Sequence, residues 1–263
     1  MTILYFTATG NCLDVAKRIG GDDAGLLSIP QMVKDGKYSF KDDAIGIIFP
    51  VFYCDIPDYI RNFLAKVRID CEYMFVIATF GEGSGSISDE VQKLMDHRSI
   101  PVHYINYIQM TDNYIPEFEM NAQIQQSAAK NIDGQIQKVC DDIAARRHWI
   151  ITDHPMMKEI TARKKDMLRK WARDMGVNEG EPYDLRFFAN DTCIHCATCV
   201  KVCPLGNISL DSKPIWHHNC IGCLACIQNC PKGSIHLPAE KSGTRFRNNN
   251  VSLREIIESN NQK

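Results

Sequence analysis

A repeated arrangement of cysteines constrains this chain more than any other feature of its sequence. Residues 193–210 read CIHCATCVKVCPLGNISL, and residues 220–237 read CIGCLACIQNCPKGSIHL. The two segments align without gaps at an offset of 27 residues and agree at nine of 18 positions. Each contains the pattern C-x2-C-x2-C-x3-C-P, so eight of the 12 cysteines lie within the repeats.

Closely spaced cysteines serve mainly as disulfides or as metal ligands. The sequence shows no basic leader followed by an apolar core, so we expect no secretory signal. Hydrophobic residues make up 44% of the 263 residues, which is enough to build a core without disulfide staples. We therefore expect the repeated cysteines to bind metal.

The pattern C-x2-C-x2-C-x3-C-P is typical of cysteines that bind [4Fe–4S] clusters. Zinc is the alternative, because C-x2-C pairs also build zinc ribbons, but zinc takes only four ligands, in two pairs. Zinc does not account for two cysteine triplets that are each followed by a Cys-Pro pair. We expect two clusters and interpret the nearby His195, His217 and His218 as surface or packing residues, since the eight cysteines already supply every ligand.

The repeats resemble bacterial two-cluster ferredoxins, in which the fourth cysteine of each run binds the other cluster. This resemblance implies two crossed sets of ligands. The first set comprises Cys193, Cys196, Cys199 and Cys230, and the second comprises Cys203, Cys220, Cys223 and Cys226.

The first 150 residues alternate between apolar strand patterns and amphipathic helix patterns. Strands are expected at 2–6, 26–29, 44–49, 73–80 and 102–108, and helices at 11–19, 57–67, 86–97 and 122–147. Near-continuous apolar runs are typical of parallel strands that are covered on both faces. The sequence therefore predicts an α/β domain over residues 1–150, with a doubly wound, five-stranded parallel sheet of flavodoxin-like order.

Three further segments complete the predicted organisation. Residues 151–180 are predicted as a basic helical connector, because the stretch from Arg146 to Asp174 holds nine Lys or Arg against four Asp or Glu. A solvated connector is the simpler interpretation, and a docking face for an acidic redox partner is the alternative. Residues 181–240 are expected to form a small α+β ferredoxin domain. Residues 241–263 read as a polar tail with a short helix, since SLRE at 252–255 fits a capping box.

The first strand-to-helix corner carries neutral hydrogen-bonding groups. In a doubly wound sheet, the helix at this corner presents free N–H groups and a positive dipole end to a phosphate. The corner lacks the G-x-G-x-x-G of dinucleotide folds and contains no Lys or Arg, which suits a monophosphate. Its residues are Thr7, Ala8, Thr9, Gly10, Asn11 and Cys12.

This corner resembles the phosphate loop of flavodoxins, T/S-x-T-G-N-T/S, and the whole chain resembles the flavodoxin–ferredoxin fusion proteins of anaerobic bacteria and archaea. The resemblance implies FMN, held also by the loops after the third, fourth and fifth strands. The candidate residues there are Pro50, Val51, Phe52, Tyr53, Thr79, Phe80, Gly81, Gly83, Gly85, Asn113 and Tyr114. The glycines at 81–85 nearly match a dinucleotide fingerprint, but Ser86 replaces its third glycine, so FMN is favoured over NAD. Cys12 stands where the family has Thr or Ser and is a weaker donor.

These features predict a cytoplasmic protein of an anaerobe that relays electrons between FMN, two [4Fe–4S] clusters and redox proteins such as a ferredoxin, a flavodoxin or an oxidoreductase. The net charge of −2 argues against a nucleic-acid partner. No apolar stretch approaches the roughly 18 residues of a membrane span. Two alternatives stay open: an FMN-dependent reductase of a small organic substrate, and an iron–sulfur redox sensor. The sequence therefore leaves open whether the chain is an enzyme.

Overall fold

A parallel sheet forms the centre of the N-terminal domain, and its strands follow the order β2-β1-β4-β6-β7-β8. They span β1 (Thr2–Tyr5), β2 (Gly25–Ser28), β4 (Ala44–Pro50), β6 (Tyr73–Phe80), β7 (Tyr104–Gln109) and β8 (Trp149–Ile150). Strands β4 and β6 are buried along almost their whole length, as expected for central parallel strands. The first five strands have the 2-1-3-4-5 order of flavodoxins, which confirms the predicted fold class.

The sheet differs from the prediction at one edge, where β8 is a sixth strand. It pairs with β7 through Trp149 and Ile150 alone, and a two-residue strand is too short to leave a periodic signal. Smaller elements also escaped prediction. They are α2 (Ile29–Lys34) and the parallel pair β3 (Ser39–Lys41) and β5 (Arg68–Asp70).

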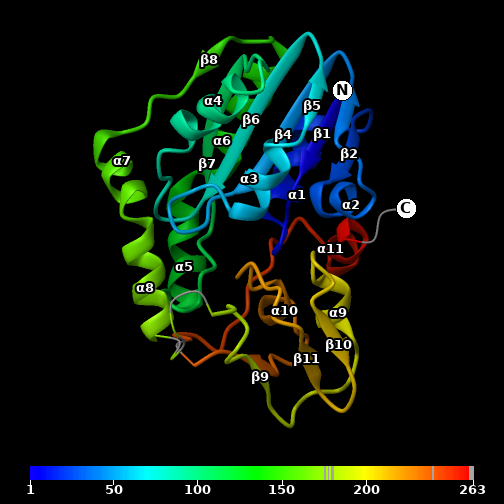
Figure 1. Cartoon of the computed structure of the whole chain (residues 1–263), viewed down its shortest axis with the longest axis vertical. Coiled ribbons are helices and arrows are strands. Elements are labelled where there is room, and N and C mark those ends of the chain that lie inside the picture. Colours follow the sequence, from blue (N-terminus) through cyan, green and yellow to red (C-terminus); the bar gives the residue numbers. More distant parts are fainter. Residues whose placement is uncertain (175, 177, 179–180, 239, 261–263) are drawn as a thin grey trace.

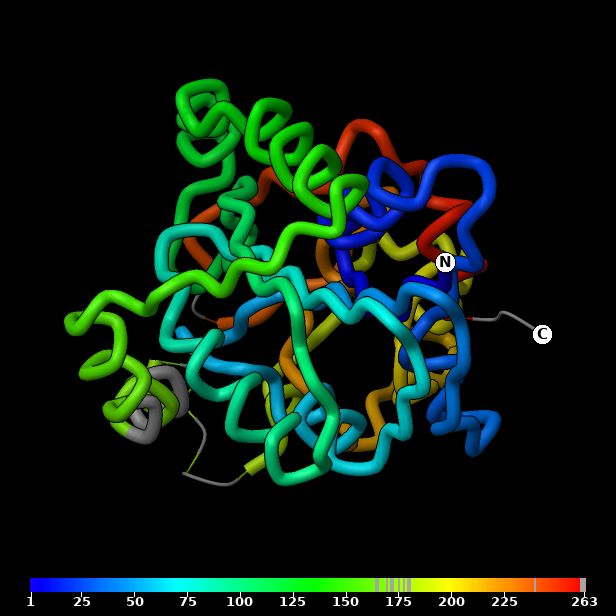
Figure 2. Tube along the Cα trace, turned by 90° about the horizontal axis from the view of Figure 1, so that it is seen from above, coloured from blue at the N-terminus to red at the C-terminus, as the bar shows by residue number. Residues whose placement is uncertain are grey.

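Helices cover both faces of the sheet. Figure 2 shows α1 (Asn11–Gly20) and α6 (Ile132–Ala144) on one face, and α3 (Asp58–Leu64) and α4 (Ile87–Asp96) on the other. The sheet and the helices on each side of it give the domain three layers.

The single helix predicted over 122–147 is divided in two. Its parts are α5 (Met120–Ser127), the short helix η1 (Ala128–Lys130) and α6. The break falls at Asn131, which has a left-handed φ of 47°. Asparagine tolerates this conformation because its short polar side chain can hydrogen-bond locally. The break lets α5 turn toward the second domain (Figure 1).

The connector consists of two helices, α7 (Pro155–Ala162) and α8 (Lys164–Asp174), which run down one side of the molecule (Figure 1). Helix α7 is fastened to the α/β domain by an ion pair from Lys158 to Asp89, with Nζ and Oδ2 2.5 Å apart. The side chains of Lys164, Lys165 and Arg169 lie outside the part of the chain that the structure describes. The alternative of a basic docking face therefore stays a prediction.

The cysteine-rich domain lies beneath the sheet in Figure 1 and consists of short elements. These are β9 (Phe188–Ala189), α9 (Thr198–Val202), β10 (Ile208–Leu210), β11 (Pro214–Trp216), α10 (Ala225–Gln228) and β12 (Ile235–His236). The strands form two antiparallel pairs, β10 with β11 and β9 with β12. One short helix contains the third cysteine of each triplet, Cys199 in α9 and Cys226 in α10, so the sequence repeat is also a structural repeat.

The two domains share packed cores. Val202, Ala225 and Ile256 lie in the same buried cluster as the core of the sheet, while Ile115 and Met120 join the cluster of the cysteine-rich domain. Ile256 belongs to α11 (Leu253–Asn260), the short helix expected near the end of the chain. The computed structural model describes residues 1–174, 176, 178, 181–238 and 240–260. Within these ranges, no helix has the length and apolar character needed to cross a bilayer.

Candidate cofactor sites

The eight cysteines of the repeats surround two small cavities. The first cavity is lined by Cys193, Cys196, Cys199 and Cys230, and the second by Cys203, Cys220, Cys223 and Cys226. The structure thus brings together the same two sets of cysteines that the resemblance implied. The fourth cysteine of each repeat faces the cavity of the other repeat.

The two cysteine loops have matching backbones. Residues at equivalent places in the two repeats adopt the left-handed conformation, in which the chain reverses tightly. The pairs are His195 and Gly222 (φ 55° and 70°), Ala197 and Leu224 (φ 59° and 56°), and Gly206 and Gly233 (φ 61° and 59°). Tight loops of this kind let three successive thiols line one side of a small cavity.

Backbone N–H groups donate to the cysteine sulfurs at equivalent positions. The Asn207 N–H donates to Cys203 Sγ at 3.3 Å, and the Ser234 N–H donates to Cys230 Sγ at 3.3 Å. Hydrogen bonds of this type stabilise charged sulfur ligands and help to set the potential of an iron–sulfur cluster.

The spacing of the cysteine thiols in each quartet suits an iron–sulfur cluster. Within the described ranges, no three His, Cys, Asp or Glu side chains are close enough to hold a single metal ion. A [4Fe–4S] cluster instead takes one thiolate at each of its irons, so its ligands surround a volume rather than a point. Each cysteine quartet lines such a volume, and the residues present therefore fit the cluster.

A larger cavity of about 410 Å³ opens at the carboxyl ends of β1, β4, β6 and β7, where ligands bind in open α/β sheets. All the cofactor residues predicted from the sequence line it except Gly10 and Gly85. Met157, Ile160 and Met167 of the connector and Gly222, Cys223 and Leu224 of the cysteine-rich domain also line it. Sequence reasoning missed these last two groups because they come from other parts of the fold and carry no motif for this site.

Gly10 and Gly85 shape the cavity from behind. A Cβ at Gly10 (φ 101°) would lie 3.0 Å from the Cβ atoms of Asn248 and Val251. A Cβ at Gly85 (φ 64°) would lie 1.9 Å from the carbonyl oxygen of Cys54. Both positions combine a positive φ with close packing, and glycine meets both demands.

The corner at residues 7–12, which we call the phosphate loop, is held by hydrogen bonds that involve its own side chains. The Gly10 N–H donates to Thr7 Oγ1 at 3.1 Å, and Asn113 Nδ2 donates to Thr9 Oγ1 at 2.9 Å. Asn11 Nδ2 donates to the Thr111 carbonyl at 3.3 Å. These bonds fasten the loop after β7 to the N-terminal end of α1, where the helix dipole favours an anion.

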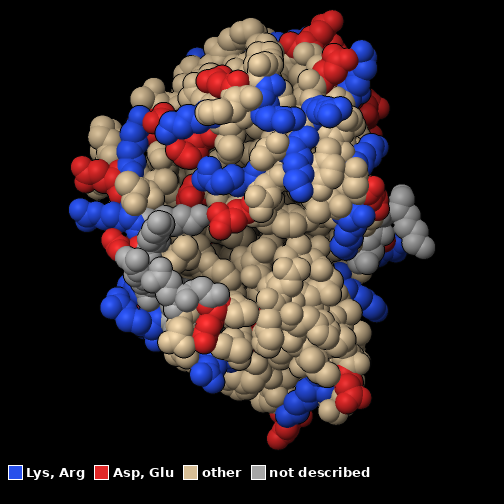
Figure 3. All heavy atoms as spheres, viewed as in Figure 1, with Lys and Arg blue, Asp and Glu red and all other residues tan. Residues whose placement is uncertain are grey.

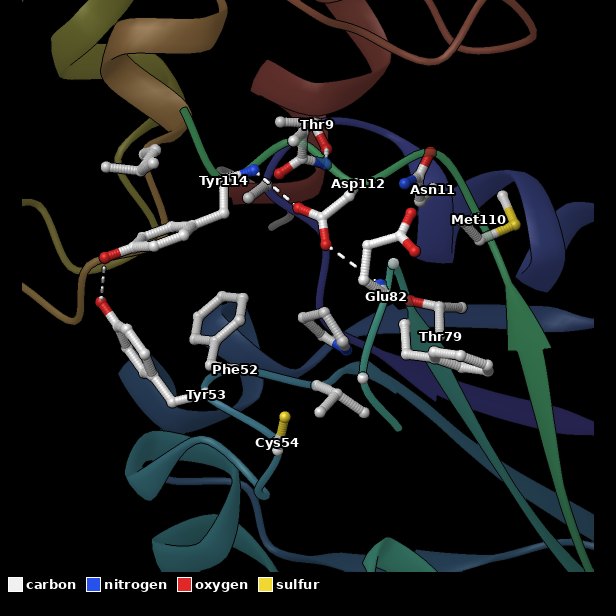
Figure 4. Close-up of a pocket in the computed structure, with 18 of the residues that line it drawn as sticks. Thr9, Asn11, Phe52, Tyr53, Cys54, Thr79, Glu82, Met110, Asp112 and Tyr114 are labelled. Atoms are coloured by element: carbon white, nitrogen blue, oxygen red, sulfur yellow. Dashed lines mark hydrogen bonds between the residues drawn. The ribbon is translucent and has the colours of Figure 1, made fainter. Parts of the chain in front are cut away.

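Aromatic side chains close the opposite end of the cavity. Figure 4 shows the hydroxyls of Tyr53 and Tyr114 facing each other, and their oxygens are 3.4 Å apart. The Tyr53 ring also stacks on Tyr183 of the cysteine-rich domain, with ring centroids 6.1 Å apart. Burial raises the pKa of Tyr53 well above its usual value, so its hydroxyl stays neutral. Tyr53 and Cys54 both have positive φ, at 52° and 55°, which is uncommon away from functional sites.

A half-buried carboxylate joins two of the cavity loops. Asp112 accepts hydrogen bonds from the N–H groups of Tyr114 (2.9 Å) and Glu82 (3.1 Å), as Figure 4 shows. Burial raises the pKa of Asp112, and the two N–H donors oppose that shift. The described lining holds Glu82, Asp112 and Glu117 and no Lys, Arg or His. Away from the phosphate loop, this cavity is therefore unfavourable for an anion.

Cys12 contacts Thr79 at the end of β6, with Sγ and Oγ1 3.1 Å apart. Its side chain is buried, with 2% exposed. Burial raises the pKa of the Cys12 thiol to about 12, although the hydrogen bond with Thr79 acts in the opposite direction. Cys12 is therefore a neutral thiol at physiological pH and not a nucleophile.

This pKa gives a simple test. When the native protein is treated with iodoacetamide at pH 8, Cys12 should be alkylated at least about 100-fold more slowly than an exposed thiol, because almost none of it is thiolate. Cys71 and Cys140, which are half-buried and lie outside the three cavities, serve as internal references. Peptide mass spectrometry over time measures the three rates. Labelling of Cys12 at the rate of Cys71 would contradict its burial.

Comparison with known proteins supports the cysteine-rich domain directly. Residues 187–231 match the family model described as a 4Fe-4S dicluster domain. No curated protein sequence is a significant match to the chain.

Several solved structures resemble part of the chain. A flavodoxin from the domain Archaea is 16% identical, with 53% of this chain and 98% of that one covered and a TM-score of 0.30. The flavodiiron core from Synechocystis is 16% identical, with 52% and 36% covered and a TM-score of 0.31. Rubredoxin:oxygen oxidoreductase from Desulfovibrio gigas is 12% identical, with 55% and 36% covered and a TM-score of 0.29. The chain thus spans about a third of the length of these last two proteins.

The strand order of the first domain and the family match of the second are independent observations. The first rests on the pairing of the strands, and the second on the sequence around the cysteines. Together they show that the chain is a flavodoxin-like domain fused to a ferredoxin-type 4Fe–4S domain.

Proposed function

We propose that this protein transfers electrons between FMN and two [4Fe–4S] clusters, and between the clusters and a separate redox protein. One observation carries the proposal. The cavity at the ends of the strands is lined both by the phosphate loop and by Gly222, Cys223 and Leu224. A flavin bound there would lie against the loop that carries a cluster ligand.

The residues present fit FMN. Neutral hydroxyl and amide groups of Thr7, Thr9 and Asn11 line the end of the cavity at the start of α1, where a monophosphate is favoured. Phe52 and Tyr53 lie along the ring end, and the residues from Thr79 to Gly83 bring backbone close to the cavity. A bound flavin would supply exchange between two-electron and one-electron carriers, and each cluster would carry one electron at a time.

The positions of the cavities also imply an order in which electrons would pass through the two clusters. Cys223 lines both the proposed flavin cavity and the cavity of the second quartet, so a cluster held by the second quartet would lie next to a bound flavin. In the first quartet Cys196 is exposed, and its neighbour Ile194 is 54% exposed. The first cluster is thus the accessible one, and it is where a partner would exchange electrons. In Figure 3 the visible face of the cysteine-rich domain carries few Lys, Arg, Asp or Glu residues, so a partner docked there would form few charge pairs.

The composition of the purified protein tests the proposal. Under anaerobic conditions we expect one FMN per chain, together with about eight iron and about eight sulfide. The expected ratios follow from one cavity for the flavin and two cysteine quartets. Zinc in place of iron, or a protein that takes up no flavin, would contradict the proposal.

One observation favours a second candidate, the reduction of a small organic substrate at the flavin. Met157, Ile160 and Met167 of the connector extend the cavity lining beyond the residues expected for FMN. Methionine-rich surfaces adapt to varied apolar ligands. Steady-state turnover of a neutral acceptor such as a quinone, by the protein alone with an electron donor, would support this candidate. The absence of turnover with intact cofactors would leave electron transfer between proteins.

A further inference from the structure

Two asparagines outside the flavin cavity contact the phosphate loop from behind. We propose that Asn229 and Asn248 are positioning residues of the FMN phosphate site, so that flavin affinity depends on the cysteine-rich domain and on the segment after it. We call residues 240–252 the C-terminal strap. The inference rests on the proposed function, because it takes the phosphate loop to hold the phosphate of FMN.

Each asparagine binds one carbonyl of the loop. Asn229, at the end of α10, donates from Nδ2 to the Ala8 carbonyl at 3.0 Å. The backbone N–H of Asn248, in the strap, donates to the Thr9 carbonyl at 2.8 Å. Asn229 is 2% exposed and Asn248 is 9% exposed, so both contacts are sheltered from water.

These contacts decide which way the peptide groups of the loop point. In a trans peptide the C=O and N–H groups point in opposite directions. Because the partners of the Ala8 and Thr9 carbonyls lie outside the cavity lining, these carbonyl dipoles turn away from the cavity. A carbonyl aimed at a phosphate would repel it, whereas an N–H group attracts it. The two asparagines therefore favour the loop conformation that suits an anion.

The strap also binds a carboxylate close to the loop in sequence, Asp14. Asp14 lies in the first turn of α1 and is 4% exposed. Its Oδ2 accepts hydrogen bonds from the side-chain amides of Asn248 (3.2 Å) and Asn250 (3.1 Å). These bonds hold the carboxylate on the strap side of the helix. Without them, Asp14 would be a buried charge with fewer partners beside a second anion.

Close packing reinforces the contact. A Cβ at Gly10 would lie 3.0 Å from the Cβ atoms of Asn248 and Val251, so the strap rests directly on the backbone of the loop. Val251 is 2% exposed, and Lys17 of α1 forms an ion pair with Glu255 at 2.5 Å. The chain is thus fixed in the residues that follow Asn248.

Helix α10 joins these contacts to the other end of the cavity. Gln228, beside Asn229, donates from Nε2 to the Asn113 carbonyl at 2.7 Å and accepts from the Phe246 N–H at 2.7 Å. Two successive residues at the end of α10, Gln228 and its C-cap Asn229, therefore contact two of the cavity loops and the strap. Asn229 is also followed directly by Cys230, a proposed cluster ligand.

Paired flavin titrations test the inference. Flavin-free full-length protein with both clusters, as Asn248→Ala and Asn229→Ala variants, is titrated anaerobically with FMN and with riboflavin, which lacks the phosphate. We expect each variant to bind FMN about 3- to 10-fold more weakly, the effect of losing buried side-chain hydrogen bonds. Asn229→Ala loses the donor to the Ala8 carbonyl. Asn248→Ala keeps its backbone bond to the Thr9 carbonyl but loses the side-chain amide that donates to Asn11 and Asp14, which hold the loop and the start of α1. Riboflavin affinity should be unchanged. Asn121→Ala is the matched control, because Asn121 is exposed and contacts the strap at Thr244 but does not contact the loop.

Each outcome has a separate meaning. Unchanged FMN affinity in Asn248→Ala, or an equal loss for both flavins, would overturn the inference, since general destabilisation weakens both. A wild-type protein that binds neither flavin would overturn the proposed function instead. If Asn229→Ala loses iron, the decision rests on Asn248→Ala and on Asn248→Leu, which keeps the branched shape of the side chain, removes the amide donor and adds no charge. The same selective loss of FMN affinity is expected for Asn248→Leu.

Discussion

Replacing Cys203 with alanine should remove the cluster next to the flavin and leave the outer cluster in place, although Cys203 belongs by sequence to the first repeat. The reason is geometric, because Cys203 lines the cavity of Cys220, Cys223 and Cys226. Iron should fall from about eight to about four per chain. Cys230→Ala should cause a loss of the same size at the other quartet, where Cys230 lines the cavity.

A second substitution shows which cluster is lost. In Cys203→Ala, replacing Cys220 as well should leave iron at about four per chain, whereas replacing Cys193 as well should lower it to about zero. The pattern should reverse in Cys230→Ala. Loss of all iron when Cys203 and Cys220 are both replaced would refute the crossed assignment. Cys140→Ala is the control, because Cys140 lies in the α/β domain and donates only to the Arg18 carbonyl at 3.4 Å.

Gly85→Ala should destabilise the protein far more than Gly36→Ala, although the two glycines have nearly the same φ, 64° and 65°. A Cβ at Gly36 would have no neighbour within 4 Å, whereas a Cβ at Gly85 would lie 1.9 Å from the Cys54 carbonyl oxygen. The conformation alone costs about 1 kcal/mol at either position. At Gly85 the displaced backbone adds about 1–3 kcal/mol.

Thermal unfolding of the two variants, with iron content matched, measures the difference. A chain of this size loses about 2–4 °C in Tm for each kcal/mol. We expect a drop of about 2–4 °C for Gly36→Ala and about 4–16 °C for Gly85→Ala. Gly85→Ala should also weaken flavin binding, because Cys54 lines the cavity. Equal changes in Tm would mean that the turn at Cys54 can yield without loss.

Elements with a strong local pattern in the sequence were predictable, whereas features that depend on contacts between distant parts of the chain were not. Buried strands such as β4 and β6 were predictable because their apolar runs are long, and the cysteine loops were predictable because their chemistry requires fixed spacing. The break at Asn131 was not predictable, because apolar periodicity continues on both sides of it. The two-residue strand β8 gave no periodic pattern at all.

The residues that line the proposed flavin cavity divide in the same way. Residues in loops that directly follow strands were predictable from position, since parallel strands end at one edge of the sheet. Met157 and Met167 were not, because they reach the cavity from the connector. The segment around Asn248 was interpreted as a polar tail, because its asparagines act through side-chain and backbone hydrogen bonds and leave no apolar pattern.

The hydrogen bond between Asn11 and Asn248 joins residues that are 237 positions apart. A ribosome adds about 5–20 residues per second, so Asn248 is made roughly 12–50 seconds after Asn11. The last strand of the sheet ends at Ile150, so only in the later part of that interval does the α/β domain have all its strands while it lacks the strap beside its phosphate loop. If the strap supports the phosphate site as proposed, full affinity for FMN would be reached only after translation has passed both cysteine repeats. A chain terminated before Asn248 would then bind FMN more weakly than the complete chain.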